Sequence, residues 1–478
     1  MRTRSVRRAL AVAAVATLAS AGAASAQTPE VVDPNLGVRT AASGLNQPIS
    51  MAFIGDDDML VLEKGTGQVK RVVGGNVEDV VLDLAVNSAS EFGLLGIALH
   101  PQFEDNGFVY LFWTHPNTGA DSTSITAVNL MSNRVERYRW TGSDLVFDRS
   151  IIRFRAPQQD AGQPPRGSHN GGVLRFGSDG KLYVIVGDTG RRGHTQNLFD
   201  GPFGDGSPDD QFGGPEPDDA HRTGVILRLN ANGTTPTDNP FFADGAAVGG
   251  QVGANIQRLF AYGIRNSFGM AVDPVSGALW EQENGDDSFS ELNRVEPGMN
   301  SGWVQIMGPA SRFAEFKQIE TSSTFFGLQQ IRWPPTNLAD TAQEALDRMV
   351  SFGPAAHFKD PELSWKYEVG PGGIGFLDSP ALGLRYADDL FMGGSRTALE
   401  GGHLFRIELN AARLRVSPSD PRLKDRVADN VAKWDITESE SLLFGRNFGI
   451  VTDIQTGPNG NLYVVSLTNG ALYEIFRR

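Results

Sequence analysis

The sequence predicts an all-β fold, a six-bladed β-propeller of four-stranded antiparallel blades with long loop insertions. Six stretches share one plan, in which an apolar run, a turn and a short apolar strand follow one another; they are Ser50–Leu62, Gly93–Trp113, Gly171–Asp188, Phe268–Gly285, Gly373–Gly394 and Thr452–Leu467. Asp-Gly and Asn-Gly turns between apolar strands favour β-hairpins. The 56 glycines and 26 prolines among 478 residues also suit many short strands joined by turns. Such repeats predict blades arranged in a ring around a central channel.

Individual strands follow from this plan. The clearest unit is Gly171–Asp188, in which a Ser-Asp-Gly turn joins two apolar strands, and Gly457–Val464 repeats it near the end of the chain. Gly224–Asn230 is expected to be an outer strand of a neighbouring unit. An early strand, Gly37–Ala42, is expected to pair with Leu472–Ile475, because that closure leaves no open sheet edge.

The chain is longer than six compact blades require, so loop insertions must hold the excess. A four-stranded blade needs about 40–50 residues, and the insertions are expected at about residues 200–222 and 305–360. The first is rich in aspartate, glycine and proline, which is typical of a surface loop. The second holds the one helix that the sequence predicts, where Thr341 and Glu344 form a capping box. No linker interrupts the repeats, and we expect one propeller domain over residues 27–478.

Residues 1–26 have the pattern of a cleaved secretory signal peptide. Four arginines stand close to the N-terminus before the apolar run Ala9–Leu18, and Ala24-Ser25-Ala26 supplies the small residues of a cleavage site. The apolar run is shorter than the roughly 20 residues that cross a bilayer, so a membrane anchor is disfavoured. We expect a periplasmic or secreted protein with no membrane span. The absence of cysteine excludes disulfides.

The acidic composition limits the partners of the chain. Its formal net charge is −14, and an acidic surface repels phosphate backbones, so nucleic acid is not an expected partner. No glycine-rich loop follows a strand and opens a helix, which argues against a nicotinamide cofactor on a dinucleotide-binding fold. The sequence leaves a monomer and a homodimer open.

Two polar residues precede the innermost strands of neighbouring units. His169 lies beside Gly171 and Gly172, and an imidazole suits a general base near neutral pH. Arg265, followed by Asn266, occupies the matching point of the next unit, where a guanidinium can hold an anion or a developing oxyanion. Because equivalent positions of a ring converge on one mouth, we expect both in one cavity. A loop histidine bonded to a carbonyl and a surface ion pair are the alternatives.

Oxygen-bearing residues follow the same strands. The segment Glu283–Glu291 combines carboxylates with a glycine, and such loops suit calcium, which also accepts backbone carbonyls as ligands. A solvated acidic turn is the alternative. Asp188 ends the strand after His169, where it either binds a substrate hydroxyl or fixes the loop.

Several motifs occur in an order that resembles the soluble quinoprotein glucose/sorbosone dehydrogenase family. They are Glu91–Phe103, Ser168–Gly172, Gly263–Asn266, Glu291–Asn293 with Asn300–Trp303, and Gly370–Gly373. The resemblance covers the chain from about residue 37 to 478. It implies a six-bladed propeller that binds pyrroloquinoline quinone and calcium and oxidises sugars.

The resemblance also implies roles for particular residues. The matching histidine, His169, takes the proton from the anomeric hydroxyl of the sugar, while Arg265 and Asn266 lie against the quinone. Three residues match positions that line the sugar and cofactor pocket: Glu91, Asp188 and Gln196. Arg396 is the nearest match to a cofactor-binding lysine. The calcium site is matched by the backbone carbonyls of Gly285 and Asp286, with Asp287 and Glu291 as further candidate ligands.

The chain departs from the family pattern at two places. Asp286 stands where the family has a proline, and Ser290 where it has an aspartate. The stretch Phe448–Asp453 lacks the two arginines that face the cofactor carboxylates in well-characterised members, and Arg446 is close but offset. Each lost charge-assisted hydrogen bond is worth about 1.5–3 kcal/mol, so cofactor binding is expected to be weaker unless Arg446, Arg396 or an insertion compensates.

These observations predict an exported quinoprotein sugar dehydrogenase that acts on CH–OH donors. It would oxidise an aldose-type sugar at the anomeric carbon by hydride transfer to pyrroloquinoline quinone and pass electrons to an external acceptor. Two alternatives stay open: a calcium-dependent lactonase-type hydrolase, and a carbohydrate-binding propeller without chemistry.

Overall fold

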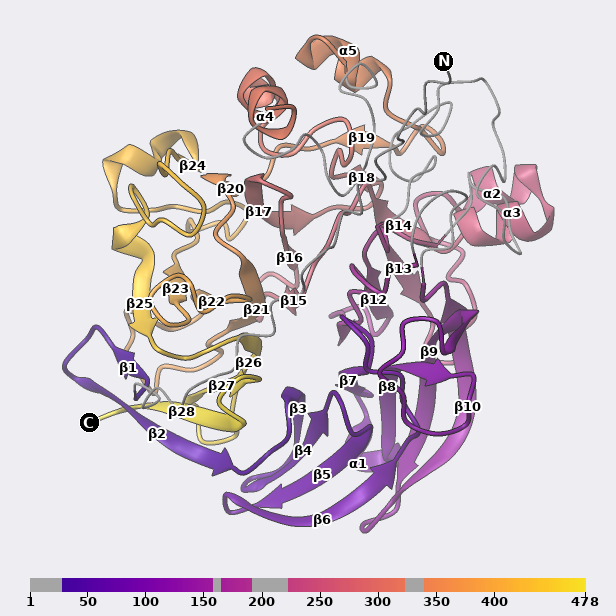
Figure 1. Cartoon of the computed structure of the whole chain (residues 1–478), viewed down its shortest axis with the longest axis vertical. Coiled ribbons are helices and arrows are strands. Elements are labelled where there is room, and N and C mark those ends of the chain that lie inside the picture. Colours follow the sequence, from indigo (N-terminus) through magenta and orange to yellow (C-terminus); the bar gives the residue numbers. More distant parts are fainter. Residues whose placement is uncertain (1–27, 158–164, 191–221, 323–338) are drawn as a thin grey trace, which may run out of the picture.

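Small antiparallel sheets surround a common axis in this chain (Figure 1). The computed structural model describes residues 28–157, 165–190, 222–322 and 339–478. The prediction of an all-β propeller is confirmed. The segment 1–26, Gln196 and nearly all of the first insertion lie outside the described residues. Within the described parts of the chain, no helix has the length and apolarity needed to cross a membrane.

The described strands form six sheets. The first contains β3 (Pro48–Gly55), β4 (Asp58–Glu63), β5 (Gln68–Val73) and β6 (Asn76–Asp83). The second contains β7 (Leu94–Leu99), β8 (Phe108–Pro116), β9 (Val128–Trp140) and β10 (Leu145–Phe154). The third contains β11 (Leu174–Phe176), β12 (Leu182–Val186), β13 (Val225–Leu229) and β14 (Leu259–Tyr262), extended by β18 (Met299–Asn300) and β19 (His357–Phe358).

The remaining sheets complete the ring. The fourth contains β15 (Gly269–Val272), β16 (Leu279–Glu283), β17 (Ser288–Val295), β20 (Leu363–Tyr367) and β24 (Val427–Ala428). The fifth contains β21 (Pro371–Phe376), β22 (Leu390–Gly394), β23 (Leu404–Ile407), β25 (Leu443–Arg446) and β1 (Glu30–Val31). The sixth contains β26 (Val451–Thr456), β27 (Leu462–Ser466), β28 (Ala471–Arg477) and β2 (Leu36–Ser43).

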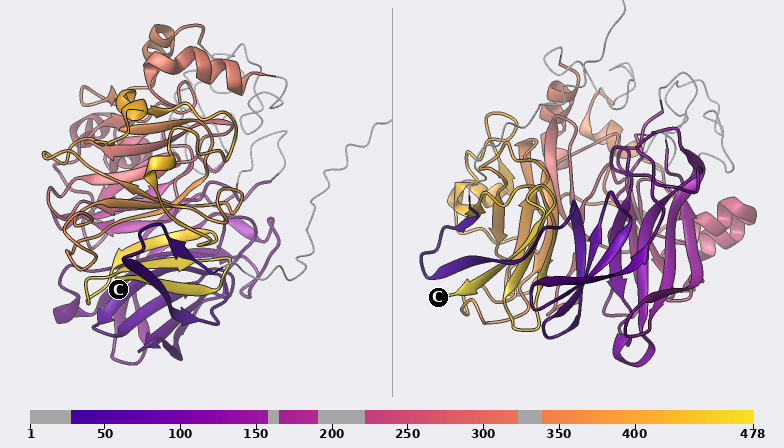
Figure 2. Two further views of the ribbon diagram at one scale, coloured as in Figure 1. Left: turned by 90° about the vertical axis from the view of Figure 1, so that its left-hand side faces the viewer. Right: turned by 60° about the horizontal axis from the view of Figure 1, so that its bottom comes forward.

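The sheets close on themselves. The innermost strands contact one another in the order β3, β7, β11, β15, β21 and β26, and β26 contacts β3 again. The N-terminal β2 pairs antiparallel with the C-terminal β28, with Val38 opposite Ile475 (Figures 1 and 2). The predicted closure is therefore confirmed. The strand predicted within Gly224–Asn230 is present as β13, but its predicted place as an outer strand of a neighbouring unit was wrong, because it lies between β12 and β14 in the sheet of the Gly171–Asp188 unit.

Uniform four-stranded sheets were the wrong expectation. Three sheets carry additional short strands at their outer edges, namely β18 with β19, β24, and β1. Two of these additions pair in parallel with their neighbours. They come from chain segments that return to a sheet edge, where they satisfy backbone groups that an edge leaves unpaired.

Short helices lie outside the ring of sheets, and the sequence predicted only one of them. That one is α5 (Ala342–Asp347), where the Thr341 side chain accepts a hydrogen bond from the Glu344 amide as expected. The others are α1 (Phe103–Asn106), α2 (Phe242–Val248), α3 (Gly250–Ile256) and α4 (Phe313–Glu320), with the 3-10 turns η4 (Ala310–Arg312), η7 (Pro421–Asp425) and η8 (Glu440–Leu442). None of α1 to α4 has a side-chain N-cap bond, so the sequence lacked its usual start signal.

The core lies between neighbouring sheets. Phe112 of β8, Val184 of β12 and Leu227 of β13 belong to one cluster and are fully buried. Each such side chain stabilises the fold by about 1.5–3 kcal/mol relative to exposure. Because apolar contacts hold each sheet to the next, the loops at the axis keep fixed relative positions.

A buried carboxylate ties the last sheet to the first and third. The Asp453 Oδ2 atom of β26 accepts hydrogen bonds from the Ser50 hydroxyl (2.7 Å) and the Met51 amide (3.1 Å) of β3. Its Oδ1 atom accepts from Nη2 of Arg175 on β11 (2.8 Å). Asp453 is 2% exposed.

We predict that Asp453→Ala lowers the free energy of unfolding by about 2–4 kcal/mol, because it breaks this tie and leaves the Arg175 charge unpaired. Chemical denaturation followed by tryptophan fluorescence measures the change. The exposed Asp56 supplies the control, and Asp56→Ala should stay within about 0.5 kcal/mol of the wild type. Equal stability of the two variants would contradict the proposed role of Asp453.

Candidate active site

One cavity of about 730 Å³ collects most of the candidate residues. Its wall includes residues from the innermost strand of every sheet, namely Ser50, Leu95, Arg175, Gly269, Ile374 and Thr452. Of the predicted site residues, it is lined by Glu91, His169, Arg265, Asn266, Gly285, Asp286, Asp287 and Arg396. Asp188 lies directly behind His169. Arg446 does not line the cavity; it pairs with Glu400 on the fifth sheet.

His169 is held by hydrogen bonds at its backbone amide and at its ring. Its backbone has a positive φ of 57°, and its amide donates to the Glu91 Oε2 atom (2.6 Å). Its Nδ1 atom lies 2.6 Å from Oδ1 of Asp188. Because an ionised carboxylate only accepts hydrogen bonds, Nδ1 donates to Asp188, and in the neutral ring Nε2 then keeps its lone pair. This arrangement gives a buried imidazole that can take a proton at Nε2.

Asp188 is built to stay ionised although it is buried. Burial acts to raise its pKa, but the adjacent His169, the nearby Arg265 and the Gly190 amide outweigh this and hold the pKa below its usual value. The indole Nε1 of Trp303 donates to Asp188 Oδ2 (2.8 Å). Asp188 therefore fixes the tautomer and orientation of His169.

Arg265 lies close to the His169–Asp188 pair, as predicted. Its backbone carbonyl accepts from the Asp188 amide (2.8 Å), and its guanidinium lies over the Trp303 ring, 5.3 Å from the centroid. Nη1 donates to the Asn284 carbonyl (2.7 Å), and Nη2 pairs with Oδ1 of Asp286 (3.1 Å). Burial acts to lower the pKa of Arg265, but Asp286 and other carboxylates raise it overall.

Several buried polar atoms in and around the cavity wall lack a partner. Within the described part of the chain, neither Nε of Arg265 nor Oδ1 of Asn266 makes a hydrogen bond. Both residues line the cavity. Buried polar groups are nearly always satisfied, so an unpaired donor and an unpaired acceptor on two consecutive residues of the cavity wall point to a polar ligand.

The predicted calcium segment forms the acidic side of the cavity. Asp286, Asp287 and Glu320 each offer one oxygen, and these oxygens lie within 4.8 Å of one another. Glu320 of α4 is buried and accepts from the Asp287 and Ser288 amides (3.0 and 2.9 Å). Burial and the neighbouring Asp286 raise the pKa of Glu320 to about 8. Glu291 is not part of this group.

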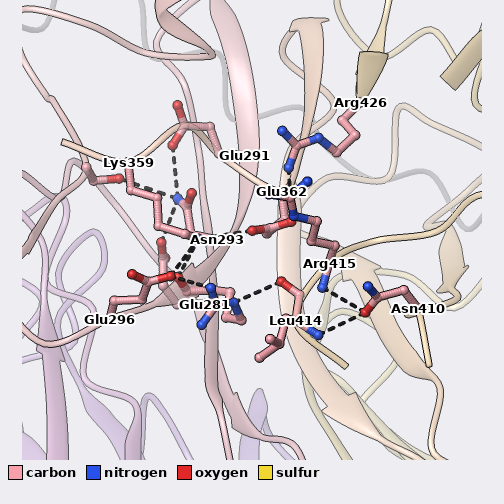
Figure 3. Close-up of polar contacts among 12 residues, drawn as sticks. Glu281, Glu291, Asn293, Glu296, Lys359, Glu362, Asn410, Leu414, Arg415 and Arg426 are labelled. Atoms are coloured by element: carbon pink, nitrogen blue, oxygen red, sulfur yellow. Dashed lines mark hydrogen bonds and ion pairs between the residues drawn. The ribbon is translucent and has the colours of Figure 1, made fainter. Parts of the chain in front are cut away.

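Glu291 belongs instead to a set of three buried glutamates with Glu281 and Glu283. The side-chain Nδ2 atom of Asn293 donates hydrogen bonds to Glu281 Oε1 (2.8 Å) and Glu291 Oε2 (3.0 Å), as Figure 3 shows. Glu283 accepts from the Arg265 amide (2.6 Å). Burial and mutual repulsion raise the pKa of Glu291 to about 8 and that of Glu281 well above its usual value. Burial raises the pKa of Glu283 to about 7.

Sequence reasoning missed four functional candidates. Lys433 and Trp434, between β24 and η8, both line the cavity, and so does Glu368 after β20. Lys433 donates to the Asp286 carbonyl (3.0 Å) and pairs with Asp287 and Glu368. The fourth is Glu320. Glu368, Lys433 and Trp434 lie in irregular segments and Glu320 lies in the uncapped short helix α4. These segments are not part of the repeated sequence pattern, so the pattern could not predict them.

Comparison with known proteins identifies the family of the chain. The family model described as Glucose / Sorbosone dehydrogenase matches residues 45–323. Quinoprotein glucose dehydrogenase B of Acinetobacter calcoaceticus is 28% identical over 279 residues, which are 57% of this chain and 53% of that protein. The chain thus spans about half the length of this relative. Aldose sugar dehydrogenase YliI of Escherichia coli is 24% identical over 437 residues, 91% of each chain.

A solved structure extends the likeness to the whole fold. The PQQ-bound form of aldose sugar dehydrogenase from Streptomyces coelicolor superposes with a TM-score of 0.55 at 22% identity. It covers 93% of this chain and 98% of that one.

The three buried glutamates predict a pH-dependent stability. Between the ordinary pKa of about 4.5 and the raised values of about 7 and 8, the folded chain holds protons that the unfolded chain has released. The free energy of unfolding therefore falls as the pH rises through this window, by a few kcal/mol from about pH 5 to about pH 8. Thermal unfolding in the presence of a chelator measures this decline.

Glu291→Gln is expected to flatten the decline, because the amide neither binds nor releases a proton in this range. Glu315→Gln is the matched control, since its partner Arg312 helps to hold the pKa of Glu315 below its usual value, outside the window. A wild-type protein whose stability does not change across the window would exclude the raised pKa values.

Proposed function

The chain belongs to the glucose/sorbosone dehydrogenase family, and we propose that it is an exported quinoprotein that oxidises an aldose-type sugar at the anomeric carbon. The observation that supports this most directly is the convergence of His169, Asp188 and Arg265 around Trp303 at one cavity. A positioned base beside a guanidinium suits removal of a hydroxyl proton coupled to hydride departure.

The residues present fit pyrroloquinoline quinone. The cavity volume falls within the roughly 300–1,000 Å³ of ligand sites. The unpaired Arg265 Nε and Asn266 Oδ1 supply a donor and an acceptor for a polar ring system. Arg396 lines the cavity and makes no hydrogen bond or ion pair with other described residues, so its charge is available to a cofactor carboxylate. Arg265, Asn266 and Arg396 would therefore hold the quinone.

The family's arginine pair is missing from this chain, and no lysine or arginine replaces it in the last inner strand, β26. Thr452 lines the cavity there, and Arg175 of β11, which also lines it, is already bound to Asp453 of the same strand as Thr452. Arg446 points to Glu400 and cannot compensate from the fifth sheet. We infer that this chain holds the cofactor mainly from the side of Arg265 and Arg396.

The chain's own groups account for the proton. Asp188 keeps Nδ1 of His169 protonated, and Nε2 takes the proton of the anomeric hydroxyl. The bound quinone supplies the hydride acceptor. Arg265, kept charged by Asp286, stabilises negative charge beside it. The resulting imidazolium is stabilised by Asp188, which stays ionised. Electrons then leave to an external acceptor.

In this arrangement Glu91 positions His169 by accepting a hydrogen bond from its backbone amide. Its carboxylate fixes the His169 amide while the residue itself lines the cavity, so one oxygen remains for a sugar hydroxyl. The proposed calcium ligands are the carbonyls of Gly285 and Asp286, with Asp287 alongside. Calcium there would polarise an accepting carbonyl. The Asp286 carbonyl is at present bonded to Lys433.

Reconstitution tests the proposed function. Titration of the purified protein with pyrroloquinoline quinone and calcium should shift the absorbance of the quinone, and aldoses should then reduce an electron-accepting dye. Lactone hydrolysis with calcium alone would favour the hydrolase instead. Binding of carbohydrate with neither activity would favour the non-catalytic propeller.

We predict that His169→Ala lowers kcat for dye reduction by about 10²–10⁴-fold, the usual contribution of a positioned general base. Quinone binding, followed by absorbance, should change little, because His169 acts on the sugar. His100→Ala is the matched control; that histidine lies at a turn outside the cavity and should leave kcat unchanged. Retention of most activity by His169→Ala would remove it as the base.

A further inference from the structure

We propose that the side-chain carboxylates of Asp286, Asp287 and Glu320 form a divalent-cation site of their own, and that the ammonium group of Lys433 competes with the cation for it. The proposed cofactor calcium would use the backbone carbonyls of Gly285 and Asp286 with Asp287 alongside, whereas this site is formed by side-chain carboxylates and adds Glu320 from α4. It needs no quinone, so it does not rest on the proposed function.

The three oxygens have the spacing of a coordination sphere. One oxygen from each residue lies within 4.8 Å of the others. A calcium ion binds oxygens at about 2.3–2.6 Å, so two ligands on opposite sides of it are about 4.6–5.2 Å apart. A single ion can therefore touch all three carboxylates without movement of the backbone.

Two of these carboxylates hold an unused oxygen. Within the described residues, Oε2 of Glu320 and Oδ2 of Asp287 have no hydrogen-bond partner, although Glu320 is 0% and Asp287 4% exposed. The other Glu320 oxygen, Oε1, accepts three hydrogen bonds, from the backbone amides of Asp287 and Ser288 and from the Ser288 hydroxyl. These bonds fix the carboxylate in place and leave its second oxygen for a ligand. An unpaired buried carboxylate oxygen is costly unless a cation or proton meets it.

Negative charge exceeds positive charge around this point. The neighbouring carboxylates are Asp286, Asp287, Glu320 and Glu368, and the cations that pair with them are Arg265 and Lys433. When all four carboxylates are ionised, four negative charges face these two cations and Arg396, which also acts on Glu368, so a divalent ion would offset the excess of negative charge. Oxygen-only donors of this kind suit calcium or magnesium better than softer metals.

Lys433 already shows that a cation is attracted here. Its Nζ atom contacts Asp287 Oδ1, the Asp286 carbonyl (3.0 Å) and Glu368 Oε2 (3.3 Å). Its side chain is 22% exposed and comes from the irregular segment between β24 and η8. The aliphatic side chain of Lys433 is flexible, so its ammonium group can move toward the cavity when a cation binds Asp287. Lys433 thus lowers the affinity of the site while keeping the protein stable without metal.

Calcium titration of the protein without quinone tests this proposal. After treatment with a chelator, isothermal titration calorimetry should detect one calcium ion bound by the wild-type chain. Lys433→Met should bind calcium at least about 10-fold more tightly, a gain of about 1.4 kcal/mol, because the competing charge is gone. Lys424→Met, which changes an exposed lysine of η7, is the matched control and should not differ from the wild type.

Loss of a ligand gives the opposite result. Glu320→Gln should weaken calcium binding at least about 10-fold, while Glu315→Gln on the same helix should not. Because Glu320 is buried, Asp287→Asn is the second variant, and circular dichroism confirms that each variant is folded. Unchanged affinity in folded Asp287→Asn, or no calcium binding by Lys433→Met, would overturn the proposal. Failure to bind quinone would leave these results standing.

Discussion

The structure depends on closure of its ring of sheets by the pairing of β2 with β28. Met51 of the first sheet and Val465 of the last lie in one buried cluster, and both are fully buried only because the two sheets meet. The polar tie from Asp453 to β3 adds directional hydrogen bonds to this apolar contact. Closure fixes the loops of distant sheets relative to one another, and the candidate site consists of such loops.

Close packing of the inner strands explains why loops rather than strands carry the chemistry. A Cβ atom on Gly96 of β7 would lie 2.1 Å from the Gly172 carbonyl, and one on Gly375 of β21 would lie 2.0 Å from that of Ile454. Only glycine fits at such distances, so neighbouring strands approach through their backbones. His169 and Arg265 stand just before inner strands, and Asp286 follows the second strand of its sheet, so all three project from the ends where side chains have room.

The parts of the site that follow the repeat were predictable, and the parts that do not were missed. His169 and Arg265 occupy equivalent points of successive units, so the ring alone placed them together. Lys433 contacts the Asp286 carbonyl across 147 positions of sequence from an irregular segment, and no local pattern encodes that contact. Glu320 was missed for a similar reason, because its helix α4 has no capping residue that would reveal it in the sequence. Edge strands such as β24 were not predicted, because a strand of two residues is too short to show an alternating pattern.

The carboxylate by which the acidic loop departs from the family pattern, Asp286, is neutralised by a neighbouring cation. A carboxylate in place of a proline at Asp286 would be a buried, unpaired charge, and breaking or omitting one partner of a buried pair typically costs 3–5 kcal/mol. Here Arg265 pairs with Asp286, and Lys433 pairs with Asp287. Arg265 therefore reaches any bound anion already partly neutralised through Nη2, and only its Nε remains unpaired among the described residues. An anionic cofactor would then depend more on Arg396, which forms no ion pair with other described residues, because the last inner strand offers no cation.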